Sequence, residues 1–125
     1  MTRIALVVDD SRVARAYLAR ILANLGYRVC EAGDGDEALE LLAVMPEPDV
    51  VFVDRYMPHM DGLELIRALR SELGLSNAAI VMVTCDNKPE TIRAALSEGA
   101  DEYIMKPFTE EVVASKLAYV GEKRG

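Results

Sequence analysis

Asp54 is the central candidate for a chemical role, and it ends the apolar run Val50–Asp54. The four apolar residues of this run are β-branched or aromatic, a pattern typical of a strand buried on both faces, as in a parallel sheet. Asp54 then stands at the carboxyl end of a central strand, where open α/β sheets bind their ligands. An acid at that position is a metal ligand, a nucleophile or a helix cap. We favour a chemical role, because Pro58 and the Asp61-Gly62 pair keep the following residues in a loop.

Polar side chains also follow three other apolar runs of the chain. They are Asp9 and Asp10 after residues 4–8, Thr84 after residues 79–83, and Lys106 after residues 102–105. The carboxyl ends of parallel strands meet at one edge of a sheet, so we expect these groups to lie near Asp54. Three carboxylates within about 5 Å repel one another by about 3 kcal/mol per pair at an effective dielectric of about 20. A hard divalent cation removes that repulsion, and oxygen ligands favour Mg²⁺ or Mn²⁺.

The elements that must position these groups alternate between strand and helix. Strands are predicted at residues 4–8, 28–32, 50–54, 79–83 and 102–105, and helices at residues 12–25, 36–44, 63–73, 89–98 and 110–124. Ser11 and Thr109 suit helix caps, Pro89 suits a first helical turn, and Gly26 ends the first helix. Strands that alternate with helices predict a parallel sheet with right-handed crossovers. The expected fold is therefore a single α/β domain over residues 1–125, with a five-stranded parallel sheet and helices on both faces.

Composition excludes several classes of function. The formal net charge of −7 and the pI near 4.7 argue against a surface that binds nucleic-acid phosphates. No apolar run approaches the roughly 20 residues of a membrane span, and residues 4–8 are too short for a secretory signal. We therefore expect a cytoplasmic protein without a membrane partner. Cys30 and Cys85 belong to no CxxC motif and are expected to be reduced, structural thiols.

Taken together, the motifs of this chain resemble those of bacterial response-regulator receiver domains of two-component systems. The matching segments are Asp9-Asp10, Gly33-x-Gly35-x-Glu37-Ala38-Leu39, Asp54-x-x-Met57-Pro58-x-Met60-Asp61-Gly62, Thr84, Gly99-Ala100-Asp101, Tyr103 and Lys106-Pro107. The resemblance covers the whole chain, and the combination is specific. It implies the flavodoxin-like strand order 2-1-3-4-5, of which chemotaxis receivers are an example. It also implies a phosphoprotein that assists its own phosphorylation and dephosphorylation rather than an enzyme.

The resemblance implies that Asp54 is the phosphoacceptor and that the site holds Mg²⁺, with Mn²⁺ as the alternative. Asp10 and Asp54 would coordinate the ion directly, Asp9 partly through water, and the backbone carbonyl of Tyr56 would supply a further ligand. Asp54 would attack the phosphohistidine of a histidine kinase or a histidine phosphotransfer protein and form an aspartyl phosphate.

The resemblance also implies how the phosphoryl group is bound and sensed. Lys106 and the hydroxyl of Thr84 would bind its oxygens. Thr84 would move toward it and the ring of Tyr103 would turn inward, which changes the surface of the fourth helix, fifth strand and fifth helix. We expect a downstream protein to bind at that face, and the receiver to be a monomer or a phosphorylation-dependent dimer.

Two positions depart from the commonest pattern of the family. Tyr56 replaces the smaller polar residue often found two positions after the acceptor, and Cys85 replaces the usual alanine. Neither change removes a required group. By resemblance, the side chains of Tyr56 and Asp86 flank the path of the hydrolytic water, so we expect an aspartyl phosphate that hydrolyses slowly.

Other interpretations have different sequence requirements. A phosphatase with an aspartate nucleophile usually carries a second acid two residues later, where this chain has Tyr56. A dinucleotide-binding protein needs a glycine-rich turn after the first strand, and Asp9-Asp10-Ser11-Arg12 contains no glycine. The start at Met1, just before the first strand, favours a stand-alone receiver. The alternative is a receiver excised from a larger regulator that carries a separate output domain.

Overall fold

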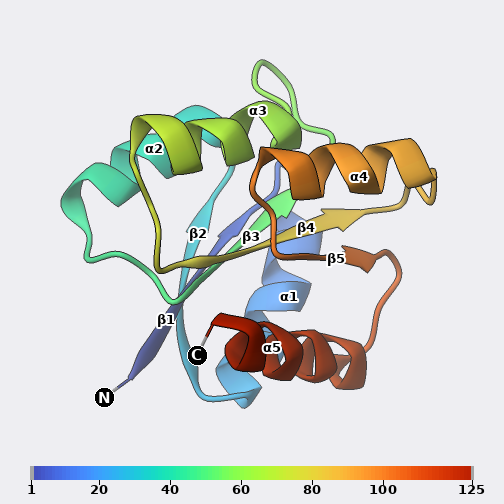
Figure 1. The fold of residues 1–125 in the computed structure, drawn as a ribbon. Helices are drawn as coiled ribbons and strands as arrows, with labels where there is room; N and C mark the ends of the chain where they lie inside the picture. Colours follow the sequence, from blue (N-terminus) through green and yellow to red (C-terminus); the bar gives the residue numbers. More distant parts are fainter. Residues whose placement is uncertain (1, 125) are drawn as a thin grey trace.

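In the computed structural model, which describes residues 2–124, five strands form one sheet in the order β2-β1-β3-β4-β5 (Figure 1). They are β1 (Arg3–Val8), β2 (Tyr27–Ala32), β3 (Val50–Asp54), β4 (Ala79–Thr84) and β5 (Glu102–Met105). Every neighbouring pair is parallel. The predicted α/β class and the strand order implied by the resemblance are both confirmed.

Helices cover both faces of this sheet. Within residues 2–124 they are α1 (Arg12–Asn24), α2 (Gly35–Val44), α3 (Gly62–Arg67), α4 (Pro89–Glu98) and α5 (Glu110–Arg124). Helices α1 and α5 lie on one face, and α2, α3 and α4 lie on the other (Figure 1). In the described part of the chain, no helix combines the length and the apolar content that crossing a membrane requires.

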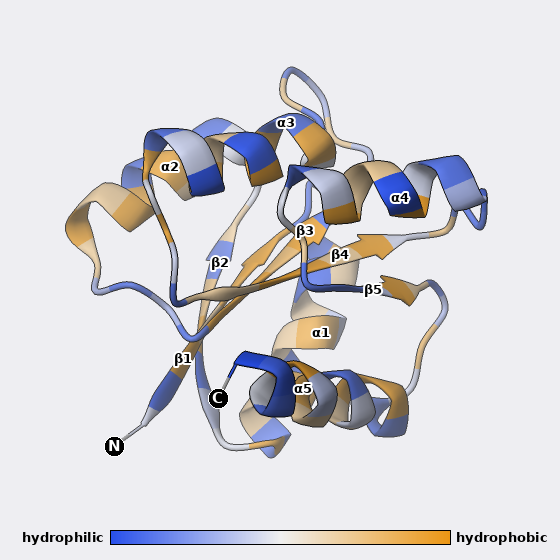
Figure 2. Cartoon of the chain, viewed as in Figure 1, coloured by the Kyte–Doolittle hydropathy of each residue, from blue (hydrophilic) through white to orange (hydrophobic). Residues whose placement is uncertain are grey.

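The core lies on both faces of the sheet, because successive side chains of β3 point in opposite directions. Val51 and Val53 pack into the cluster under α2, α3 and α4, whereas Val50 and Phe52 pack into the cluster under α1 and α5. All residues of β3, Asp54 included, are buried. Figure 2 shows the apolar central strands between helices whose outer sides are hydrophilic. This burial on both faces explains the uninterrupted apolar run and confirms the central place of β3.

Side-chain caps set where the helices near the carboxyl edge begin. Ser11 and Thr109 cap α1 and α5 with their side-chain oxygens, as predicted. Asp34 caps α2, so this helix begins at Gly35, one residue before the predicted start. Asp61 forms a capping box at the start of α3 and thereby ends the loop that follows Asp54.

The third helix differs from the predicted single α-helix over residues 63–73. After α3 the chain forms a π-helical turn (Ala68–Glu72), in which the N–H of Leu73 donates to the carbonyl of Ala68, 3.0 Å away. From this turn Arg70 donates hydrogen bonds to the carbonyls of Leu75, Ala78 and Gly99 and to the carboxylate of Asp101. The apolar spacing of this segment fits an ordinary α-helix and does not report these tertiary hydrogen bonds. They accompany the departure from α-helical to π-helical geometry.

Candidate functional site

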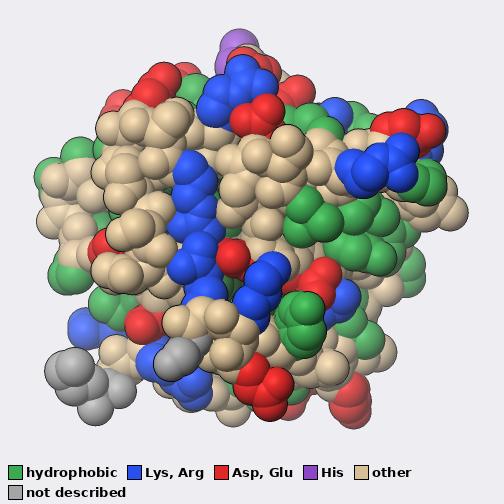
Figure 3. Space-filling model, in the orientation of Figure 1, with side chains coloured by type: hydrophobic (Ala, Val, Ile, Leu, Met, Phe, Trp, Pro, Cys, Tyr) green, Lys and Arg blue, Asp and Glu red, His purple; other side chains and the backbone are tan. Residues whose placement is uncertain are grey.

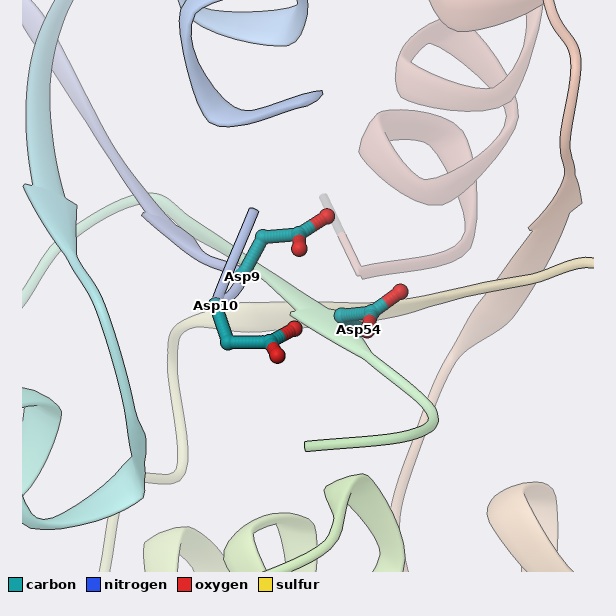
Figure 4. Close-up of side chains that lie close together, drawn as sticks. All are labelled: Asp9, Asp10 and Asp54. Atoms are coloured by element: carbon teal, nitrogen blue, oxygen red, sulfur yellow. The ribbon is translucent and has the colours of Figure 1, made fainter. Parts of the chain in front are cut away.

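Three carboxylates gather at the carboxyl edge of the sheet (Figure 4). Asp9 and Asp10 directly follow β1, and Asp54 ends the neighbouring β3, where Val8 is paired with Val53. One oxygen from each of the three carboxylates lies within 4.8 Å of the others. Asp9 and Asp54 are buried, whereas Asp10 is exposed. This cluster is able to hold a metal ion, since all-oxygen ligands suit a hard divalent cation.

Lys106, the residue after β5, reaches into the acidic cluster. Its ammonium donates hydrogen bonds to Oδ1 of Asp54 at 2.8 Å and to Oδ2 of Asp9 at 3.1 Å. Burial raises the pKa of Asp54, the hydrogen bond from Lys106 partly opposes this, and the charge of Asp9 adds to it. Burial alone would lower the pKa of Lys106, but the hydrogen bond and charge of Asp54, with those of Asp9, raise it. The amine is therefore held in its charged form against the acids.

An apolar cavity lies on the α1 side of the site. Its volume is about 450 Å³, and its lining includes Phe52, Tyr17 and Phe108 together with Asp54 and Lys106. The hydroxyl of Tyr17 donates to the carbonyl of Phe108 at 2.8 Å, which joins α1 to the loop that carries Lys106. Asp54 and Lys106 thus face apolar side chains on this side, where water solvates charge poorly.

The loop after β1 is held by hydrogen bonds of its own. Oδ1 of Asp9 accepts the N–H of Ser11 at 2.9 Å, and the backbone carbonyl of Asp9 accepts from Nη1 of Arg15 at 2.7 Å. Arg15 also forms an ion pair with Glu31, a residue of β2. Both carboxylate oxygens of Asp9 are therefore engaged, one by this turn and one by Lys106.

Thr84 ends β4 beside Asp54, and its side chain is almost completely buried, with 1% of the residue exposed. Its hydroxyl oxygen accepts the N–H of Asp86 at 3.0 Å. The predicted phosphoryl-binding hydroxyl therefore lies at the same edge as the acids and Lys106. Cys85, between these two residues, is exposed.

The carboxylate of Asp86 connects two loops and a helix. It accepts the N–H of Lys88 at 2.9 Å, the hydroxyl of Tyr56 at 2.7 Å and the hydroxyl of Thr91 at 2.8 Å. These three donors, the Lys88 N–H foremost, lower the pKa of Asp86 to about 2. The loop after β3, the loop after β4 and the first turn of α4 are thus joined through one carboxylate.

The ring of Tyr56 is half exposed, at 51%, but it is not free in solvent. Its hydroxyl is bound by Asp86, which raises the pKa of the Tyr56 phenol. In a second contact, the guanidinium of Arg55 lies over the ring of Tyr56, 4.6 Å from its centroid. The phenol, two residues after Asp54, therefore contacts two charged neighbours, one through its hydroxyl and one through its ring face.

Tyr103 lies in β5, three residues before Lys106, and is half-buried. It packs against the core cluster under α2, α3 and α4, and the ammonium of Lys116 lies over its ring. Sequence reasoning missed Lys116, and it also missed Thr91 and Arg15 at the acidic edge. None of the three belongs to a recognisable motif, because their partners come from segments distant in the chain.

The comparisons with known proteins agree with this fold. Residues 5–118 match the family described as response regulator receiver domain. The chain is 39% identical over 116 residues to chemotaxis protein CheY1 of Helicobacter pylori, and the match covers 92% of this chain and 94% of the relative. It is 40% identical over 113 residues to the chemotaxis protein CheY homolog of Campylobacter jejuni, spanning 90% and 87% respectively. The solved structure of chemotaxis response regulator CheY4 of Vibrio cholerae has a TM-score of 0.88 at 32% identity, and the match covers 96% of this chain and 99% of that one.

A parallel five-stranded sheet in the order 2-1-3-4-5 is the architecture of a CheY-like receiver. The chain belongs to the response regulator receiver domain family, which acts in two-component signalling. The expected family membership is confirmed.

Proposed function

We propose that the protein is a Mg²⁺-dependent phosphoacceptor, in which Asp54 receives a phosphoryl group from a histidine kinase or a histidine phosphotransfer protein. The observation that carries this proposal is the convergence of two further carboxylates, Asp9 and Asp10, and one lysine on Asp54. The protein then acts as a signalling switch and assists its own phosphorylation and dephosphorylation, without a substrate of its own.

The oxygen donors fit Mg²⁺, with Mn²⁺ as the alternative. Asp10 and Asp54 would bind the ion directly, and the backbone carbonyl of Tyr56 would complete the protein's contribution. Asp9 would act through water, which is supported by the engagement of both its oxygens with Ser11 and Lys106. When bound, the ion neutralises the carboxylates and the phosphoryl oxygens, so that two anions can approach each other.

The transfer itself needs little chemistry from the protein beyond position and charge. An oxygen of Asp54 forms a bond to phosphorus while the bond from phosphorus to the donor's histidine nitrogen breaks, and the electron pair stays on that nitrogen. Lys106, already 2.8 Å from Asp54, is placed to bind a phosphoryl oxygen after the transfer. The buried hydroxyl of Thr84 is placed to bind another.

The phosphoryl group would be sensed through Thr84 and Tyr103. We propose that Thr84 moves toward the phosphoryl group and that the half-buried ring of Tyr103 turns inward. The surface of α4, β5 and α5 then changes and binds a downstream protein, with the receiver as a monomer or a phosphorylation-dependent dimer. The names of the relatives favour a role in chemotaxis for this chain.

Labelling by a small phosphodonor tests the proposal. The protein is incubated with acetyl phosphate and Mg²⁺, and its intact mass is measured. We expect the mass gain of one phosphoryl group in the wild type and none in Asp54→Asn. Asp36→Asn, which removes an exposed acid from the first turn of α2, should label like the wild type. Full labelling of Asp54→Asn would show that the acceptor lies elsewhere.

A further inference from the structure

The ammonium of Lys116 lies over the ring of Tyr103, 4.8 Å from its centroid. The two side chains come from opposite faces of the sheet. Tyr103 packs against the core cluster under α2, α3 and α4, whereas Lys116 belongs to α5 on the other face (Figure 1). Because β5 is an edge strand, Lys116 reaches the ring around the open edge of the sheet.

Glu102 fixes the position of this ammonium. Its Oε1 lies 3.2 Å from Nζ of Lys116, and the same oxygen accepts the N–H of Tyr103 at 2.9 Å. The side chains of Lys116 and Glu102 are only 29% and 17% exposed, so water screens their attraction incompletely. The ammonium of Lys116 therefore contacts both the carboxylate of Glu102 and the ring of Tyr103 at the sheet edge.

Basic and acidic groups lie on both sides of this edge, as the space-filling view shows (Figure 3). A cation above an aromatic face is attracted to the ring's negative face, and the attraction grows as water is excluded. The attraction requires the ring to stay at the edge. A ring that turned inward, behind Thr84, would leave the cation.

We propose that Lys116 is a positioning residue for the Tyr103 switch, holding the ring at the edge of β5 until the site is phosphorylated. The inference rests on the proposed function, in which Tyr103 turns inward after phosphorylation. Lys116 then opposes the activated state, and by linkage it weakens the binding of a phosphoryl group or its mimic. A cation–π contact at a partly exposed site shifts such an equilibrium by about two- to fivefold.

Fluorine NMR of protein labelled with 3-fluorotyrosine tests this role. The Tyr103 signal is assigned with Tyr103→Phe and followed while beryllium fluoride, a mimic of the phosphoryl group on a carboxylate, is added at saturating Mg²⁺. Lys116→Gln keeps most of the side chain and removes the charge, and Lys116→Arg restores a cation. Lys123→Gln removes one positive charge from the last turn of the same helix and serves as the matched control.

In Lys116→Gln we expect the resting Tyr103 signal to move toward its activated position and the midpoint of the titration to fall by about two- to fivefold. Lys116→Arg and Lys123→Gln should titrate like the wild type. An unchanged or higher midpoint in Lys116→Gln, with a wild-type signal that still responds, would overturn the role of Lys116 and leave the proposed function intact. A wild-type Tyr103 signal that does not respond at all would instead contradict the proposed switch.

Discussion

The ammonium of Lys106 lies 2.8 Å from Oδ1 of Asp54, although the two residues are 52 positions apart in the sequence. The same ammonium also contacts Asp9, so one lysine offsets part of the charge of two buried carboxylates. In the absence of a metal ion, this contact is the principal favourable interaction that Asp54 makes through its side chain. Burial nevertheless raises the pKa of Asp54, which means that the contact offsets the cost of burial only in part.

Asp54→Asn should therefore stabilise the metal-free protein at neutral pH, and the gain should depend on pH. The folded pKa of Asp54 lies above its unfolded value of 3.8. Ionisation then costs stability: the penalty is absent below the unfolded pKa, grows as the pH rises toward the folded pKa, and is complete above it. Thermal melts in EDTA should show the melting-temperature difference between Asp54→Asn and wild type shrinking as the pH falls toward about 4. A difference that does not change with pH would contradict the raised pKa.

Mg²⁺ should raise the melting temperature of the wild type. Ion binding relieves the repulsion among Asp9, Asp10 and Asp54, and a ligand at ten times its dissociation constant contributes about 1.4 kcal/mol. For a domain of this size the rise should be about 5 °C. Asp10→Ala should abolish it, whereas Glu40→Gln, an exposed acid of α2, should retain it. A wild-type melting temperature that does not change with Mg²⁺ would contradict the proposed metal site.

Tyr56→Asn should accelerate loss of the phosphoryl group several-fold. The hydrogen bond to Asp86 holds the phenol ring in place. If the ring flanks the path of the attacking water, as the family resemblance implies, asparagine is too small to cover that path. Each 1.4 kcal/mol of barrier corresponds to a tenfold change in rate. Phosphorylated protein is freed of donor and its decay is followed by intact mass. Tyr56→Phe, which keeps the ring and loses the hydrogen bond, should decay at an intermediate rate.

Equal decay of wild type and Tyr56→Asn would show that the ring does not shield the acyl phosphate. The ring is half exposed and its hydroxyl is bound to Asp86, so replacing it changes no buried contact of the core.

Arg70→Met should destabilise the fold by about 3 kcal/mol, because it leaves three part-buried backbone carbonyls without this donor. It also removes one of the three partners of the Asp101 carboxylate, which keeps Arg124 and the N–H of Ile80. Arg67→Met, three residues earlier, is the matched control. Arg67 pairs with Glu98, but its side chain is 64% exposed, so its loss should matter far less. Urea unfolding measures both variants. Similar losses for the two would show that burial does not distinguish them.

The sequence was sufficient for the fold class, the order of the elements and the residues of the acidic edge. An apolar run such as Val50–Asp54 reports its burial on both faces through local composition alone. Parallel connectivity then brings every strand's carboxyl end to the same edge, which predicts that the residues at the ends of β1, β3 and β5 lie near one another. Asp9, Asp54 and Lys106 lie together for that reason.

Only the tertiary structure decided which side chains those residues contact. The bond from Tyr56 to Asp86 depends on how the loops after β3 and β4 approach each other, and the contact of Lys116 with Tyr103 depends on the reach of α5 around an edge strand. The hydrogen bonds that Arg70 donates from the π-helical turn likewise go to carbonyls of later segments. Periodicity along a chain encodes the face on which a residue lies, but the distance between side chains of separate elements is set by their packing.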